Sequence, residues 1–273
     1  MSEATLSEQL DPDLRGVRVG LSGAIPEPDE WQGRALDWEI LNAVTTLADT
    51  VFSGGGYLVH GSHPSFTPRI LAQAAPYAEE RGEPVATFVL SGLFADSALA
   101  RQLRDPRHED VLNLILVDPV IPPGHEGHGA EDSVVRNASL AAMRERLVNE
   151  MDAMVIIGGK RWAGSANKPG TQEELELAQA RGIPCYPLGG LGGMAAELGA
   201  LPEFQESQRS RPLTAGPSSP QLTTGVRGLD SAGVGKPDAA ALSPDEYAFV
   251  RSTQDYGRAI GVIAARLAHR HSG

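Results

Sequence analysis

The sequence predicts an α/β protein with a doubly wound, Rossmann-like parallel sheet of about five to seven strands, followed by a flexible segment and a C-terminal helix. Three observations favour this fold class. Apolar runs of strand length alternate with stretches of helical periodicity, glycines follow several of these runs, and the run at residues 154–157 is continuous rather than alternating. Continuous apolar runs are typical of parallel strands that helices cover on both faces.

The predicted elements alternate between strand and helix from residue 17 to about residue 200. Strands are expected at residues 17–23, 50–52, 85–90, 112–117, 154–157 and 183–187. Helices with apolar side chains at helical spacing are expected at residues 31–48 and 68–78. Since connections between parallel strands are right-handed, the loops that follow the strands should meet at one edge of the sheet.

The chain divides into three predicted segments. Residues 13–202 form the expected α/β domain, whereas residues 203–243 are rich in Ser, Pro, Gly and Thr and have little apolar periodicity. Such a segment buries too little apolar surface to offset its ordering entropy, so we expect a flexible linker. Residues 244–270 should form one helix that packs on the domain or against a second subunit.

The composition narrows the possible partners. A net charge of −12 argues against nucleic acid, because that binding depends on Lys and Arg set against phosphates. A small anion remains compatible, since backbone amides and helix N-termini can hold a phosphate within an acidic protein. The chain shows neither a secretion signal nor an apolar run of the ~18 residues needed to span a bilayer, so we expect a cytoplasmic protein without membrane contact.

Three glycine loops are expected around one crevice at the carboxyl edge of the sheet. They follow the runs at residues 50–52, 154–157 and 183–187, and the second leads through residues 169–171 into a helix. Glycine lets a ligand approach the main chain closely, and a helix N-terminus attracts anions. The residues expected to bind the ligand in these loops and at the exit of the first strand are Gly23, Ser53, Gly54, Gly55, Gly56, Gly158, Gly159, Gly170, Thr171 and Gly190.

Thr171 and Glu174 also fit a purely structural interpretation. Their spacing matches the T-x-x-E pattern of a capping box, in which each side chain bonds the other residue's amide at the start of a helix. The single cysteine, Cys185, lies in an apolar run, so we interpret it as a buried structural thiol rather than a nucleophile.

The order of these motifs resembles a known superfamily. An SGGG run, then R-x7-D-A-x-V-I-I-G-G, then G-T-x-E-E-L is similar to the Rossmann-like proteins that include the LOG phosphoribohydrolases and the SLOG domains of nucleotide signalling and defence. The likeness spans residues 17–198 and fits the SLOG group better than the LOG enzymes. By that resemblance, Glu174 and Arg144 match the glutamate and arginine that LOG enzymes use. The arginine is one residue out of register, which leaves Arg146 and Arg136 as alternatives.

The resemblance implies a nucleotide-derived ligand and suggests hydrolysis of its N-glycosidic bond. A carboxylate near the anomeric carbon would stabilise the positive charge that develops on the sugar, a role assigned first to Glu174 and otherwise to Glu173. Residues following the strands would contact phosphate or base, namely His60, Lys160 and Trp162. Alternatives are a nucleotide sensor without catalysis and an interaction scaffold. We expect no cofactor, and a homo-oligomer by resemblance.

A second group of titratable residues lies in the loop that begins at residue 122. His125, His128, Glu131 and Asp132 stand within eight positions of one another. A zinc site needs three or four rigid ligands, and no predicted helix fixes the two histidines. The pattern therefore favours a solvated loop over a metal site.

Overall fold

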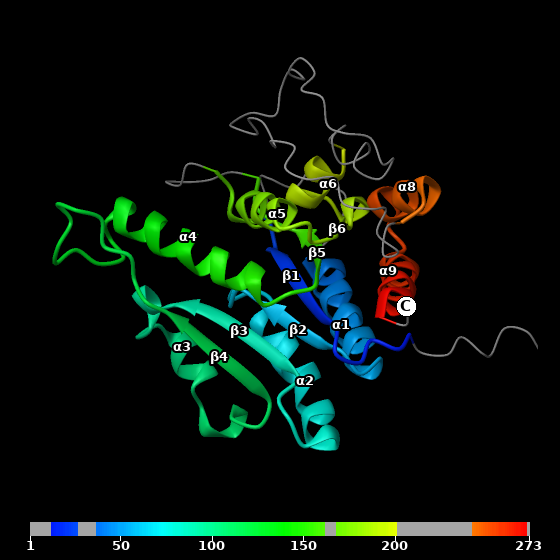
Figure 1. The fold of residues 1–273 in the computed structure, drawn as a ribbon, viewed down its shortest axis with the longest axis horizontal. Helices are drawn as coiled ribbons and strands as arrows, with labels where there is room; N and C mark the ends of the chain where they lie inside the picture. Colours follow the sequence, from blue (N-terminus) through cyan, green and yellow to red (C-terminus); the bar gives the residue numbers. More distant parts are fainter. Residues whose placement is uncertain (1–11, 27–36, 162–167, 201–241, 272–273) are drawn as a thin grey trace, which may run out of the picture.

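The computed structural model describes residues 12–26, 37–161, 168–200 and 242–271. Within these residues it shows an all-parallel, six-stranded sheet of order β4-β3-β2-β1-β5-β6, which confirms the predicted α/β class and strand number (Figure 1). The strands are β1 (Arg18–Ala24), β2 (Tyr57–His60), β3 (Ala86–Ser91), β4 (Leu112–Val117), β5 (Ala153–Gly158) and β6 (Cys185–Pro187). Every residue of the interior strand β5 is buried, as its continuous apolar run predicts.

Helices cover both faces of the sheet. On one face α1 packs against α2, and on the other α4 packs against α5 (Figure 1). The described helices of the domain are α1 (Asp37–Ser53), α2 (Thr67–Arg81), α3 (Ala98–Leu103), α4 (Ser133–Asn149), α5 (Gly170–Ala180) and α6 (Gly193–Gly199). Strand order reverses at β1, which pairs with β2 on one side and with β5 on the other. Ligands of open α/β sheets bind at such a switch point, outside the carboxyl ends of the strands.

The prediction of a strand at residues 50–52 is wrong. These residues are the last turn of α1, and Val51 and Phe52 continue its buried stripe through Leu47 and Ala48. That spacing of three and four residues is helical. The SGGG run therefore ends a helix and precedes β2, rather than following a strand.

The C-terminal region contains two helices instead of one. Helix α8 (Pro244–Ser252) and helix α9 (Tyr256–His271) are separated because Thr253 adopts an extended conformation. The side chains of Thr253 and Asp255 accept hydrogen bonds from the amides of Asp255 and Arg258, which stops the first helix and starts the second. Helix α9 packs on α1 and α8 packs on β6. In the described parts of the chain, no helix has the length and hydropathy of a membrane span.

Candidate functional site

A cavity of about 510 Å³ lies at the carboxyl edge of the sheet. Its walls come from the exits of β1, β2, β3 and β5, from one side of α4 and from the first turn of α5. Helix α4 contributes side chains at one face of successive turns, namely Arg136, Leu140, Met143 and Arg144. The location matches the crevice expected from a doubly wound sheet.

The structure brings some of the predicted residues together here and places others elsewhere. The predicted residues that line the cavity are Gly23, His60, Arg144, Lys160, Gly170, Thr171 and Glu174, with Arg136 from the alternatives. The cavity lining does not include Ser53, Gly54, Gly55 and Gly56. They lie at the amino edge of the sheet, where Gly54 accepts a bond from the amide of Leu14 just before β1. Trp162 lies outside the described residues.

The other glycines are packed against the protein itself. A Cβ atom on Gly158 would lie 2.6 Å from the carbonyl oxygen of Ala24, and one on Gly159 would lie 2.9 Å from Oγ1 of Thr171. Their positive φ angles of 62° and 91° turn the chain from β5 toward α6. A Cβ on Gly190 would lie 1.8 Å from the carbonyl oxygen of Thr253. The end of α8 therefore covers this third loop, and Gly190 is not at the cavity.

Glu174 is a largely buried carboxyl group in the cavity wall, with a side chain that is 13% exposed. Burial raises its pKa, because the charged form loses solvation, while Arg144 and a hydrogen bond from Ser22 partly oppose this rise. The capping box with Thr171 does not form, since α5 begins at Gly170 and has no side-chain cap. The carboxyl group instead faces the cavity.

Arg144 joins this carboxyl group to its neighbour. Its Nη1 donates to Oε2 of Glu173 at 2.5 Å, and its Nε lies 3.8 Å from Oε1 of Glu174. Glu173 does not line the cavity, so of the two carboxylates only Glu174 faces it. Arg146 pairs instead with Glu150 at the protein surface. Among the three arginines suggested by the sequence, Arg144 is the one that contacts Glu174.

His60 faces the cavity with its ring but uses both ring nitrogens internally. Nδ1 lies 3.0 Å from the carbonyl oxygen of Leu21, and Nε2 accepts a bond from the amide of His63. These partners require a neutral ring protonated at Nδ1. Burial lowers the pKa of His60 to about 4. His60 thus fixes the loop after β2, and a phosphate contact from its nitrogens is incompatible with these bonds.

Ser62, two residues beyond β2, is the most unusual residue of the cavity wall. Its φ of 54° is the positive value of a non-glycine residue, a conformation that L side chains rarely adopt. The residue is 4% exposed, and its buried Oγ has no hydrogen-bond partner among the described residues. Strain combined with an unsatisfied hydroxyl is typical of a functional position.

Most charged side chains that line the cavity are basic, whereas the net charge of the protein is negative. Among the described lining residues the basic side chains are Arg136, Arg144, Lys160 and Lys168, and the acidic one is Glu174. Arg144 and Lys168 are also bonded to Glu173 and Glu176, outside the lining. A concentration of cations in a protein of net charge −12 favours an anionic ligand.

Several residues of the cavity wall were not predicted from the sequence. The exit of β3 contributes apolar and hydroxyl side chains, namely Leu90, Phe94, Ser97 and Leu99. Ser22 was missed as well, although it bonds Glu174. The sequence signal for these wall residues is their position, because a residue just after a parallel strand lies at the edge of the sheet where ligands bind.

The fold and this cavity define a Rossmann-like α/β protein with a cavity at the switch point of the sheet. Comparison of the sequence with protein families matches the SLOG cluster2 family over residues 13–208, and the chain belongs to that family. Proteins of curated function give no match. The X-ray structure of TM1055, a structural genomics target, covers 68% of this chain and 81% of its own at 16% identity and a TM-score of 0.41.

Proposed function

We propose that the protein binds an anionic nucleotide derivative in the cavity at the carboxyl edge of the sheet. One observation carries this proposal: a buried carboxyl group, Glu174, lies among the basic side chains of Arg136, Arg144, Lys160 and Lys168. Cations suit the phosphates of such a ligand, and a carboxyl group suits a ribose hydroxyl or the anomeric carbon. The volume, about 510 Å³, falls in the range of small-molecule sites.

The orientation of the ligand follows from the two sides of the cavity. The N-terminus of α5, at Gly170 and Thr171, together with Lys168 offers amides and a cation to a phosphate. Apolar side chains from the segment after β3 and from α4 also line the cavity, where Phe94 and Leu140 would offer a surface for a base. The sugar would then lie between them, next to Glu174. Nucleoside monophosphates, NAD and cyclic ADP-ribose species all satisfy this arrangement.

We propose further that Glu174 supports hydrolysis of the N-glycosidic bond. Ionised Glu174 would accept a proton from a water molecule as the water oxygen bonds to the anomeric carbon. The carbon–nitrogen bond breaks, and the base departs with the electron pair and takes up a proton, either the one that Glu174 has accepted or one from solvent, in which case Glu174 releases its proton to solvent. A carboxylate beside the reacting carbon also stabilises the positive charge on the sugar. Arg144 would hold the ligand phosphate or the carboxylate pair in place.

A panel of ligands tests both statements on the full-length protein. Thermal shift and calorimetry with nucleoside monophosphates, NAD and cyclic ADP-ribose should find one or more that bind, and chromatography should find the released base. Glu174→Gln should keep binding within a few-fold and lower release by at least ~100-fold, the usual effect of removing transition-state stabilisation. The exposed Glu145→Gln on α4 is the matched control.

The outcomes separate the proposals. If none of these compounds binds, nucleotide binding is wrong. Binding without any released base would exclude hydrolysis and leave the second candidate, a nucleotide sensor. The sensor is favoured by one observation, namely that Arg144 is already engaged by Glu173 at 2.5 Å. An arginine held in this way can position Glu174 without acting on a leaving group.

We also propose that the protein is a homo-oligomer. Among the described residues, five large apolar side chains have exposures above 40%. Trp38 lies on α1, whereas the other four lie on β4, on the segment after it and at the start of α4, namely Leu116, Val120, Ile121 and Val134. Because β4 is an edge strand, its unpaired backbone and these side chains could pack against a second copy. Light scattering should then give a mass above 28.8 kDa for the wild type, reduced to the monomer by Leu116→Lys.

A further inference from the structure

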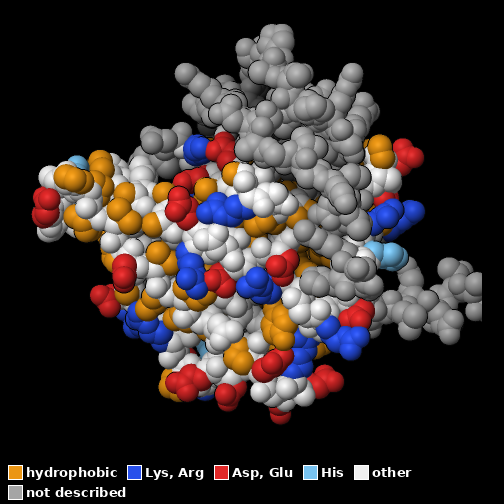
Figure 2. Space-filling model, in the orientation of Figure 1, with side chains coloured by type: hydrophobic (Ala, Val, Ile, Leu, Met, Phe, Trp, Pro, Cys, Tyr) orange, Lys and Arg blue, Asp and Glu red, His pale blue; other side chains and the backbone are white. Residues whose placement is uncertain are grey.

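The segment between β4 and α4, residues 118–132, projects from the domain at the left of Figure 1. Apolar, acidic and histidine side chains gather at its tip (Figure 2). Gly124 and Gly127 have φ angles of 86° and 83°, which allow two tight turns in succession. The amides of His125 and His128 close these turns on the carbonyl oxygens of Pro122 and His125. The two imidazoles are therefore carried on hydrogen-bonded backbone.

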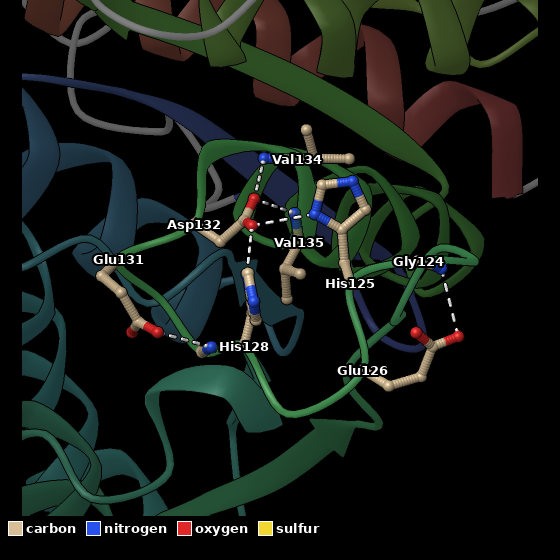
Figure 3. Close-up of polar contacts among 9 residues, drawn as sticks. Gly124, His125, Glu126, His128, Glu131, Asp132, Val134 and Val135 are labelled. Atoms are coloured by element: carbon tan, nitrogen blue, oxygen red, sulfur yellow. Dashed lines mark hydrogen bonds and ion pairs between the residues drawn. The ribbon is translucent and has the colours of Figure 1, made fainter.

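Asp132 gives the histidines a rigid third partner (Figure 3). Its Oδ1 caps α4 by accepting bonds from the amides of Val134 and Val135, at 2.8 and 3.3 Å. The cap fixes the orientation of the carboxylate. Its Oδ2 faces Nδ1 of His125 at 2.8 Å and Nδ1 of His128 at 2.7 Å. The histidines lie outside a helix, as the sequence predicts, but a carboxylate held at the start of α4 faces both of them.

The three facing atoms have the spacing of a metal site. They all lie within 4.8 Å of one another. A tetrahedral zinc ion bonded at about 2.0 to 2.1 Å would hold its ligand atoms about 3.3 Å apart. The present N···O distances of 2.8 and 2.7 Å are about half an ångström shorter than that spacing, so the side chains would have to move apart slightly to admit the ion. His128 is 56% exposed, so a water or another ligand has room at the fourth position.

Charge and ligand type indicate which ion the site would take. The segment carries Asp118, Glu126, Glu131 and Asp132 and no Lys or Arg, so its own charge favours a cation. Glu126 and Glu131 accept bonds from the amides of Gly124 and Gly129, which holds these carboxylates to the backbone of the same segment (Figure 3). Two imidazoles with one carboxylate suit zinc and related transition metals, whereas calcium and magnesium prefer oxygen ligands alone.

We propose that His125 Nδ1, His128 Nδ1 and Asp132 Oδ2 bind a divalent transition-metal ion of the zinc type. This site is separate from the cavity and does not depend on the nucleotide proposal. It would clamp the projecting segment to the first turn of α4, the helix that also lines the cavity.

Metal titration of the full-length protein tests this site. After chelator treatment and dialysis, calorimetry with ZnCl2 should show one ion bound per chain, and CoCl2 should give the visible absorption bands of tetrahedral coordination. His125→Ala and His128→Ala should each weaken zinc binding by at least tenfold. Asp132→Asn keeps the helix cap, because Asn caps as well as Asp, yet loses the anionic ligand, so it should weaken binding similarly.

The control is His108→Ala, which removes a half-buried histidine outside the segment and should bind zinc like the wild type. Circular dichroism would verify that each variant is folded. The site is refuted if zinc binds equally to the wild type and the His125 and His128 variants, if His108→Ala causes the same loss, or if Asp132→Asn leaves affinity unchanged.

Discussion

The hydroxyl group of Ser22 on β1 donates a 2.5 Å hydrogen bond to Oε2 of Glu174 on α5. Ser22 is buried, and 152 residues separate the two along the chain. The bond joins strand β1 to helix α5, whose first turn forms part of the cavity wall. It also favours the charged form of a carboxyl group whose pKa is raised by burial. The ionisation of Glu174 therefore depends on Ser22.

Replacing Ser22 with alanine should raise the pKa of Glu174 further, because the variant loses a bond that favours the carboxylate. Carboxyl ¹³C NMR during a pH titration measures this directly. Unfolding free energy should fall by about 1 kcal/mol, the usual value of one hydrogen bond. Ser62→Ala changes a hydroxyl in the same cavity that does not bond Glu174, so it should leave this pKa where it is. An unchanged titration in Ser22→Ala would show that the bond has no electrostatic role.

Arg144→Met and Arg146→Met form a matched pair on α4. Arg144 lies between Glu173 and Glu174, and its loss should raise the pKa of Glu174 and weaken binding of an anionic ligand by at least ~10-fold, the effect of losing a charge-assisted bond. Arg146 is half exposed and pairs with Glu150, an interaction worth about 0.3 to 0.5 kcal/mol. Calorimetry with the best ligand should show normal affinity for Arg146→Met. Equal affinities for both variants would remove Arg144 from the site.

The sequence was sufficient for the fold because burial and periodicity agree in most elements. The continuous run of β5 and the alternation of strands and helices are local signals. The prediction of a strand at residues 50–52 was wrong because a run as short as Thr50-Val51-Phe52 fits both a short strand and the last turn of a helix. The buried positions Leu47, Ala48, Val51 and Phe52 resolve the ambiguity in favour of α1.

The site was less predictable because it depends on contacts between distant residues. The glycine loops lie where the chain turns, but Gly158, Gly159 and Gly190 are packed against protein atoms rather than open to a ligand. Glu174 could be proposed from its motif, whereas its partner Ser22 carries no local signal. The opening of a cavity is set by which side chains fill the edge of the sheet, and periodicity does not encode that.

Ser62 should contribute to ligand affinity without contributing to stability. Its Oγ is buried and has no partner in the described structure, so Ser62→Ala should leave the unfolding free energy unchanged or raise it by up to about 1 kcal/mol. If the hydroxyl donates to the ligand, affinity should fall by roughly fivefold to tenfold, the value of one neutral hydrogen bond. Calorimetry and urea unfolding measure the two effects. Destabilisation with unchanged affinity would assign the hydroxyl an internal role.

His60 should make the protein less stable in mild acid. Its pKa is about 4 in the folded protein and 6.5 in the unfolded chain, because burial and the charge of His63 disfavour the imidazolium ion. Between these values the unfolded state binds the additional proton, so stability falls as pH decreases from 6.5 to 4. The loss should total about 3 kcal/mol, at up to ~1.4 kcal/mol per pH unit.

His60→Gln removes this titration while keeping polar groups for Leu21 and His63. Its unfolding free energy, measured in urea at several pH values, should change less steeply than that of the wild type over the same interval. The raised pKa of Glu174 acts in the opposite direction, since its folded form takes up a proton more readily than the unfolded chain. Because both proteins retain Glu174, the difference between their slopes isolates His60. Parallel slopes would mean that the imidazole ring is protonated in the folded protein despite its burial.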